Sequence, residues 1–189
     1  MKIFSLVLFS FYTFAVFAEA IPSGWIADVA RARRHAADEN KPILLVISGP
    51  SADKASKALK KDVIDNDDFS SAIKKNAVCL IAYTQSGKKK EKREEELKKT
   101  FSAVYKGKVP CAAVLDSKLK LLSVPAGNTA YDFVKAVSDV LVKNGGKEIP
   151  ELKKLKKEYD KEQLKKDKKS RKDKNRKEKK SSRKTDEEL

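Results

Sequence analysis

An unbroken run of β-prone apolar residues at 43–47 constrains the fold more than any other feature of the chain. Its residues do not alternate with polar ones, so a strand formed from them must be covered on both faces. A second run of the same character occupies residues 77–83. Helical patterns precede and follow both runs, which indicates an α/β fold with helices on both faces of a sheet.

The remaining elements follow from hydrophobic spacing and turn residues. Helices are predicted over residues 25–39, 52–64 and 131–142, and a short helix over 66–73. A highly charged insert at 86–99 runs into a further helix, and two more strands are expected at 111–115 and 119–124. The connections between the early strands contain helices, which favours parallel pairing. The tight turn between the last two strands favours antiparallel pairing.

The chain divides into three parts by composition. Residues 3–17 are mostly apolar and lead into Ala18-Glu19-Ala20, a pattern typical of a cleavable signal peptide over residues 1–20. The alternative is an uncleaved anchor, which needs about 20 apolar residues to cross a bilayer. Residues 21–146 are of a size typical of one folded domain, and residues 147–189 form a Lys/Arg-rich tail.

The tail carries 19 Lys or Arg residues against 11 Asp or Glu residues. Ile149, Leu152, Leu155 and Tyr159 are spaced three to four apart, which predicts one or two helical turns docked on the domain. Beyond Leu164 the tail is expected to be a solvated helix or disordered. Its basic residues could serve solubility alone, or they could contact a polyanion. The candidate polyanion contacts are Lys165, Lys166, Lys168, Lys169, Arg171 and Lys172.

Among polyanions, anionic lipid headgroups or acidic polysaccharides are favoured over nucleic acid. Tyr159 is the tail's one aromatic residue, which argues against base stacking, and an exported protein meets little nucleic acid. A protein partner is expected for the domain, but the sequence does not name it. The residues also do not predict a metal site or a cofactor, because the chain has one histidine, His35, and two separated cysteines.

The order of elements resembles secreted domains of the thioredoxin-like family. The resemblance rests on Trp25, Ala30, Lys41-Pro42, Leu59, Asp68-Phe69, Val109-Pro110 and Gly127, in this order and spacing. It implies a thioredoxin-like α/β fold, with a central mixed sheet of about four strands flanked by helices and a basic helical or disordered tail. It also implies that Pro110 is a cis-proline.

The chemistry of that family needs Cys-x-x-Cys where the helix after the first strand begins. Here the matching positions are Asp53 and Ser56, or Ala52 and Ala55 in the other register. Neither register contains a sulfur atom. The resemblance therefore implies a domain that does not exchange disulfides, and no other catalytic constellation suggests an enzyme.

The two cysteines, Cys79 and Cys111, fall in strands expected to flank the central one on opposite sides. Strands two apart lie about 9.6 Å apart, beyond the roughly 7 Å between Cα atoms that a disulfide allows. Two free, buried thiols are predicted. The alternative is that Cys111, beside Pro110, serves as a lone reactive thiol.

Two hypotheses of function follow, with a third that depends on the C-terminus. The first is an exported, redox-inactive binding or scaffold module, and the second is a single-thiol oxidoreductase that uses Cys111. The third is a luminal partner of folding clients retained by Asp186-Glu187-Glu188-Leu189, which resembles an endoplasmic-reticulum retrieval signal. A bacterial source implies periplasmic or secreted location, and a eukaryotic source implies the endoplasmic reticulum lumen.

Overall fold

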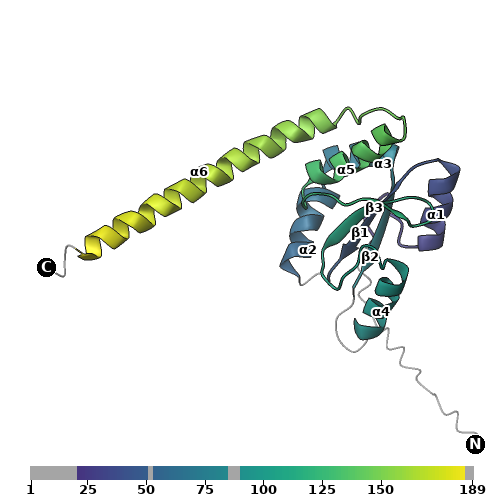
Figure 1. Ribbon diagram of the computed structural model, residues 1–189, viewed down its shortest axis with the longest axis horizontal. Helices are drawn as coiled ribbons and strands as arrows, with labels where there is room; N and C mark the ends of the chain where they lie inside the picture. Colours follow the sequence, from purple (N-terminus) through teal and green to yellow (C-terminus); the bar gives the residue numbers. More distant parts are fainter. Residues whose placement is uncertain (1–20, 51–52, 85–89, 186–189) are drawn as a thin grey trace, which may run out of the picture.

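A four-stranded sheet in the order β2-β1-β3-β4 forms the centre of the computed structural model (Figure 1). The structure describes residues 21–50, 53–84 and 90–185, with side chains up to residue 170. Residues 1–20, assigned above to the signal peptide, and residues 186–189, which hold the retrieval-like sequence, lie outside the described residues.

The central strand is β1 (Ile43–Ser48), and all six of its residues are buried. It pairs in parallel with β2 (Val78–Tyr83) and antiparallel with β3 (Cys111–Leu115). The edge strand β4 (Leu121–Ser123) pairs antiparallel with β3. The predicted mixed sheet of about four strands, with its parallel and antiparallel parts, is confirmed.

Alternate residues of β1 point into two separate cores. Leu44 and Val46 pack with residues of the helices on one face, while Ile43, Leu45 and Ile47 pack with residues of the helices on the other. The first face is covered by α2 (Lys54–Leu59), its continuation η1 (Lys60–Ile64), α3 (Asp67–Asn76) and α5 (Ala130–Lys143). The second face is covered by α1 (Val29–Asp38) and α4 (Lys90–Thr100). This layering is the predicted thioredoxin-like arrangement.

The first helix begins later than predicted because tertiary contacts hold the residues before it outside the helix. Trp25 lies before α1 and stacks on Phe69, with ring centroids 6.4 Å apart, in the core on the opposite face of the sheet. Ile26 then forms a β-bridge with Leu80 of β2. The helix starts only after Asp28, whose carboxylate accepts a hydrogen bond from the Arg31 N–H at 2.8 Å. Trp25 and Ile26 therefore fit the helical spacing without belonging to the helix.

Two other helices differ from their predicted extents. The predicted helix over 52–64 begins at Lys54, with Asp53 as N-cap, and its last part, η1, is a π-helix. The predicted short helix after Asn66 is the ten-residue α3. Asn66 accepts a hydrogen bond from the Phe69 N–H at 2.9 Å, so it is the N-cap of the helix.

The predicted docking of the tail is confirmed. Ile149, Leu152 and Leu155 are buried in the core that α3 and α5 share. The ring of Tyr159 lies 5.1 Å from that of Tyr131 on α5, measured between centroids. Helix α6 (Leu152–Thr185) then continues without interruption.

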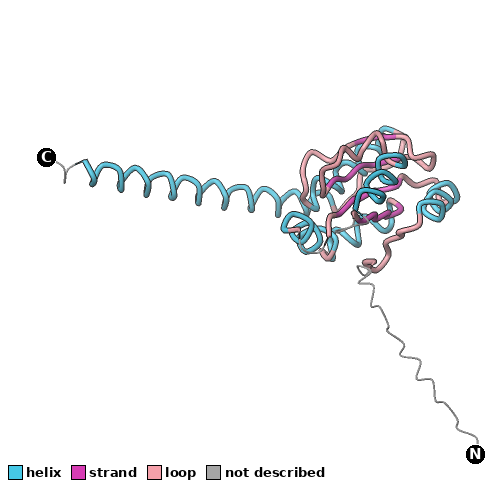
Figure 2. The backbone as a smooth tube through the Cα atoms, turned by 90° about the horizontal axis from the view of Figure 1, so that it is seen from below, coloured by secondary structure: helices cyan, strands magenta, loops and turns pink. Residues whose placement is uncertain are grey.

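Polar contacts fix the same junction. The Ile149 N–H donates to the buried Ser138 hydroxyl at 3.1 Å, and the Lys154 ammonium lies 2.7 Å from the Asp68 carboxylate. Beyond these contacts α6 projects away from the domain (Figures 1 and 2). In the part of the chain described here, no helix is both long and apolar enough to cross a membrane.

If α6 is held by its buried leucines, Leu155→Ala should lower the free energy of unfolding by about 2–4 kcal/mol, because it leaves a cavity in the core. Leu164→Ala is the matched control on the same helix, where the side chain is 60% exposed. The control should change stability by no more than about 0.5 kcal/mol. Urea denaturation followed by circular dichroism measures both, and equal effects would contradict the docking.

Candidate functional site

The candidate site lies where β1 ends and α2 begins. Asp53 is the N-cap of α2, and its carboxylate accepts a hydrogen bond from the Ser56 N–H at 2.7 Å. Hydrogen bonding from the Ser56 hydroxyl, and then from the Ser56 N–H, holds the pKa of the Asp53 carboxyl below its ordinary value. These hydrogen bonds favour the ionised carboxylate of Asp53, and a negative charge at this position interacts favourably with the positive end of the helix dipole.

Ser56 faces the sheet, and its hydroxyl has a structural partner. The Gly49 N–H, in the loop after β1, donates to the Ser56 hydroxyl at 2.8 Å, and both residues are buried. Ala55 is exposed. A buried residue at 56 and an N-cap at 53 favour the Asp53–Ser56 register over the Ala52–Ala55 register, and Ala52 itself lies outside the described residues.

The space around Gly49 is closed. A Cβ atom at residue 49 would lie 2.9 Å from the Ser56 hydroxyl oxygen and 3.1 Å from a methyl group of Val109. The loop after β1, the start of α2 and the segment before β3 thus meet at one point. The sequence did not predict the bond between Gly49 and Ser56, because a buried serine one turn into a helix has no signal that distinguishes it from an exposed one.

The segment before β3 contains the expected proline geometry. The Val109–Pro110 peptide bond is cis, at the position where the resemblance places a cis-proline. Cys111 follows directly as the first residue of β3. Asp53, Ser56, Pro110 and Cys111 therefore all belong to the end of the sheet from which α2 starts.

The two cysteines lie on strands that flank β1 on opposite sides. Cys79 is paired with Leu44 on one side, and Cys111 with Ile47 on the other. Both are free thiols, as predicted. The expectation that both are buried is wrong for Cys111, which is half-buried because β3 begins there, at the end of the sheet.

Burial sets the acidity of both thiols. It raises the pKa of Cys79 to about 12, against a small opposing effect of Lys74. It raises the pKa of Cys111 to about 11. Reactive cysteines instead have a lowered pKa, through a helix N-terminus or a neighbouring positive charge. The arrangement holds both sulfurs as neutral thiols at neutral pH.

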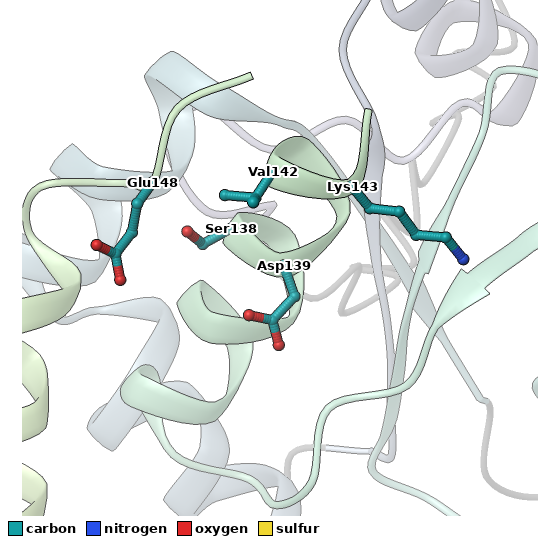
Figure 3. A pocket seen from close by; sticks show the side chains of 5 residues that line it. All are labelled: Ser138, Asp139, Val142, Lys143 and Glu148. Atoms are coloured by element: carbon teal, nitrogen blue, oxygen red, sulfur yellow. The ribbon is translucent and has the colours of Figure 1, made fainter. Parts of the chain in front are cut away.

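A separate hollow of about 470 Å³ lies over the last turns of α5 (Figure 3). It is lined by Ser138, Asp139, Val142, Lys143 and Glu148. The Ser138 hydroxyl accepts the Ile149 N–H, and the Asp139 carboxylate lies 2.6 Å from the Lys135 ammonium. Asp139 and Glu148 supply carboxylates to the lining, but among the described side chains neither is hydrogen-bonded to the Ser138 hydroxyl, so the hollow shows no nucleophile–base pair.

The structure also places His35 and the residues that could act as metal ligands. His35 lies 3.7 Å from Glu39 on the exposed side of α1. Within the described residues, no three His, Cys, Asp or Glu side chains gather as metal ligands would.

The basic candidates lie on α6. Lys165, Lys166, Lys168 and Lys169 are exposed there. Arg171 and Lys172 follow in the same helix, where the structure describes the backbone only. The charged helix α4 packs on the other face of the sheet from the site where α6 docks, so the described parts of these two charged helices do not form one surface.

Comparison with known proteins agrees with this geometry. Residues 24–117 match a family model described as thioredoxin-like. No curated protein matches the chain. Among solved structures, one titled DsbH oxidoreductase is similar, with 17% identity and a TM-score of 0.48, over 65% of this chain and 87% of that chain. A likeness of this extent carries no information on activity.

The raised thiol pKa values predict slow alkylation of the native protein. At pH 7, maleimide should label the native protein more slowly than the urea-unfolded chain, by about a hundredfold at Cys111 and about a thousandfold at Cys79, because almost no thiolate is present. Mass spectrometry of quenched samples gives both rates. Ser71→Cys, at an exposed position on α3, supplies a fast-labelling control. Native labelling of Cys111 at the control's rate would show an activated thiol.

Proposed function

Through residues 24–117 this chain belongs to the thioredoxin-like family, and on that premise we propose that it is a binding or scaffold module that does not catalyse disulfide exchange. The observation that carries the proposal is the pair Asp53 and Ser56 at the start of α2. Disulfide exchange requires one thiol to attack and a second to resolve the mixed disulfide. A carboxylate and a hydroxyl can do neither.

Both side chains also have structural roles at this position. Asp53 caps α2, and the Ser56 hydroxyl satisfies the buried Gly49 N–H. These are the hydrogen bonds that a helix start and a buried loop require. The site therefore supports a structural role for these two side chains, which hold the loop, the helix and the segment at Pro110 in place.

The single-thiol alternative receives less support. Its candidate, Cys111, has a pKa raised to about 11 by burial. A lone thiol that attacks disulfides at neutral pH needs a substantial thiolate fraction. Cys79 is more deeply buried and lies beyond β1 from Cys111, so it does not serve as a resolving partner.

The second part of the proposed function is the basic helix. Residues 152–185 include 18 Lys or Arg residues and six Asp or Glu residues. A helix of this charge, anchored at one end to a folded domain, can attach that domain to an anionic surface by counterion release. Anionic lipid headgroups and acidic polysaccharides are the surfaces we favour, and a protein partner would bind the domain.

The absence of disulfide-exchange activity is tested by insulin reduction with dithiothreitol, followed by turbidity. The protein as it stands should leave the rate at that of the blank. Asp53→Cys/Ser56→Cys should accelerate it, because the two thiols would then stand at a helix N-terminus that lowers the pKa of the first.

The matched control for this experiment is Lys57→Cys/Lys60→Cys. It has the same spacing at exposed positions further along the same helical segment, away from its N-terminus, and it should stay at the blank rate. Acceleration by the unaltered protein would overturn the redox-inactive assignment. An inactive Asp53→Cys/Ser56→Cys variant would mean that these are not the active-site positions of the fold.

We further propose that the domain is exported, with residues 1–20 removed. The support is the apolar run at 3–17 followed by Ala18-Glu19-Ala20. The location is periplasmic or secreted in a bacterial source and the endoplasmic reticulum lumen in a eukaryotic one. The intact mass of protein recovered from its own cells should correspond to a chain that begins at Ile21. A mass that retains residues 1–20 would contradict cleavage.

A further inference from the structure

The basic residues of α6 are not distributed evenly around the helix. From Lys157 onward, steps of three or four residues meet a Lys or Arg each time. We call this set the basic ladder; its members are Lys157, Lys161, Lys165, Lys168, Lys172, Arg176, Lys179 and Arg183. Residues at such spacing share one face of an α-helix. The ladder is therefore a single row of positive charge along one side of α6.

The docked end of α6 fixes which way this face points. Leu152 and Leu155 are buried, and Tyr159 and Gln163 are half-buried, so these four residues mark the face turned toward the domain. At about 100° per residue, the midpoint of Lys157, Lys161, Lys165 and Lys168 lies about 170° around the helix from the midpoint of that face. All four lysines are exposed. The ladder thus faces away from the domain.

The acidic residues of this part of α6 lie on its flanks. They are Glu158, Asp160, Glu162 and Asp167, and each falls within about 105° of the midpoint of the docked face. The lysines outside the ladder sit beside them. Lys156 is four residues before Asp160, and Lys166 is four residues after Glu162, while Lys161 and Lys165 of the ladder are three residues after Glu158 and Glu162; all these spacings allow ion pairing. Because each of the four acidic residues lies about 65° or more from the midpoint of the ladder, the net positive charge is densest along the ladder.

The shape of this surface favours a linear ligand. The ladder from residue 157 to residue 183 spans about 39 Å on a straight helix at 1.5 Å per residue. Because α6 projects from the domain (Figures 1 and 2), the described part of the domain does not obstruct the row. A linear polyanion can lie along it and meet a positive charge at about every 5.6 Å.

A lipid bilayer suits this helix less well. A helix that lies in a membrane interface buries a wide apolar face opposite its charged one. The face opposite the ladder is turned toward the domain in the first turns of α6. On the described side chains of this helix, Leu164 is the exposed large apolar residue. Single-stranded nucleic acid would need aromatic platforms, and Tyr159 is already packed against Tyr131.

We infer that the basic ladder is a binding face for a linear acidic polysaccharide. The polysaccharide is recognised by the regular spacing of the Lys and Arg residues along one side of α6, and not by the total charge of the helix. This inference rests on the proposed attachment role of the tail and names its ligand class and its contact face. It also separates the six candidate residues, five lysines and one arginine, into two groups. Lys165, Lys168 and Lys172 belong to the ladder, while Lys166, Lys169 and Arg171 do not.

The test compares two full-length variants that lose the same charge. The ladder variant is Lys161→Gln/Lys165→Gln/Lys168→Gln, and the flank variant is Lys156→Gln/Lys166→Gln/Lys169→Gln. Lysine and glutamine have similar helix propensity, so α6 is retained, and circular dichroism checks this. Binding to heparin, a linear sulfated polysaccharide, is measured at fixed moderate salt and by the salt concentration of elution from a heparin column.

The ladder variant should bind heparin at least about tenfold more weakly than the unaltered protein, and the flank variant less than about threefold more weakly. Equal losses in the two variants would overturn the ladder while leaving the tail's attachment role in place. If the two triple substitutions combined leave heparin binding unchanged, the attachment role itself fails. Equally tight or tighter binding to phosphatidylserine vesicles or to duplex DNA, at matched anion concentration and salt, would overturn the polysaccharide assignment.

Discussion

The burial of β1 on both faces and along both edges is the constraint on which the other features depend. A strand of this composition releases the most free energy when no part of it meets water. Helices must then cover both faces, and other strands must pair on both sides. The divided core, the parallel pairing with β2 and the antiparallel pairing with β3 all follow from the need to bury this one apolar strand.

The central position of β1 also keeps the two cysteine thiols of the chain apart. Cys79 and Cys111 are held on the two neighbours of β1, so the central strand keeps them apart as long as the sheet is intact. Burial then raises the pKa of each thiol. The end of β1 also sets the position of Gly49, whose N–H must find an acceptor because it is buried. Ser56 supplies that acceptor, and Asp53 caps the helix one turn earlier. In the proposed register, hydrogen-bonding groups thus occupy the place at which the family's chemistry needs thiols.

The sequence was most informative where composition alone decides structure. Residues 43–47 and 77–83 are apolar on both faces, and both are buried strands. It was less informative where a distant contact decides. Trp25 has helical spacing with later residues, yet its stacking on Phe69 draws it into the other core, and α1 begins only at Val29. The half-exposed state of Cys111 likewise depends on where β3 begins, which no local pattern specifies.

In the candidate site, too, some features follow from the local sequence and others depend on contacts between distant segments. Asp53 as a helix cap follows from its residue type, and the cysteines' separation followed from the order of the strands. The bond between Ser56 and Gly49 joins two segments whose approach is set by the sheet, so neither residue signals it alone. The spacing of Leu152, Leu155 and Tyr159 did predict docking, because an apolar stripe in a basic tail has few other uses.

Helix α6 has two opposed tendencies, and its docked end reconciles them. Lysine and arginine favour helix intrinsically, but ladder lysines about 6 Å apart along the axis repel one another. Physiological salt screens such repulsion only partly, since the Debye length is about 8 Å. The buried residues at 149–155 and the Lys154–Asp68 contact hold the first turns of the helix in place. Extension from a formed end avoids the unfavourable nucleation step. A polyanion lying along the ladder would remove the remaining repulsion, so binding and helix formation should reinforce each other in the outer turns of α6.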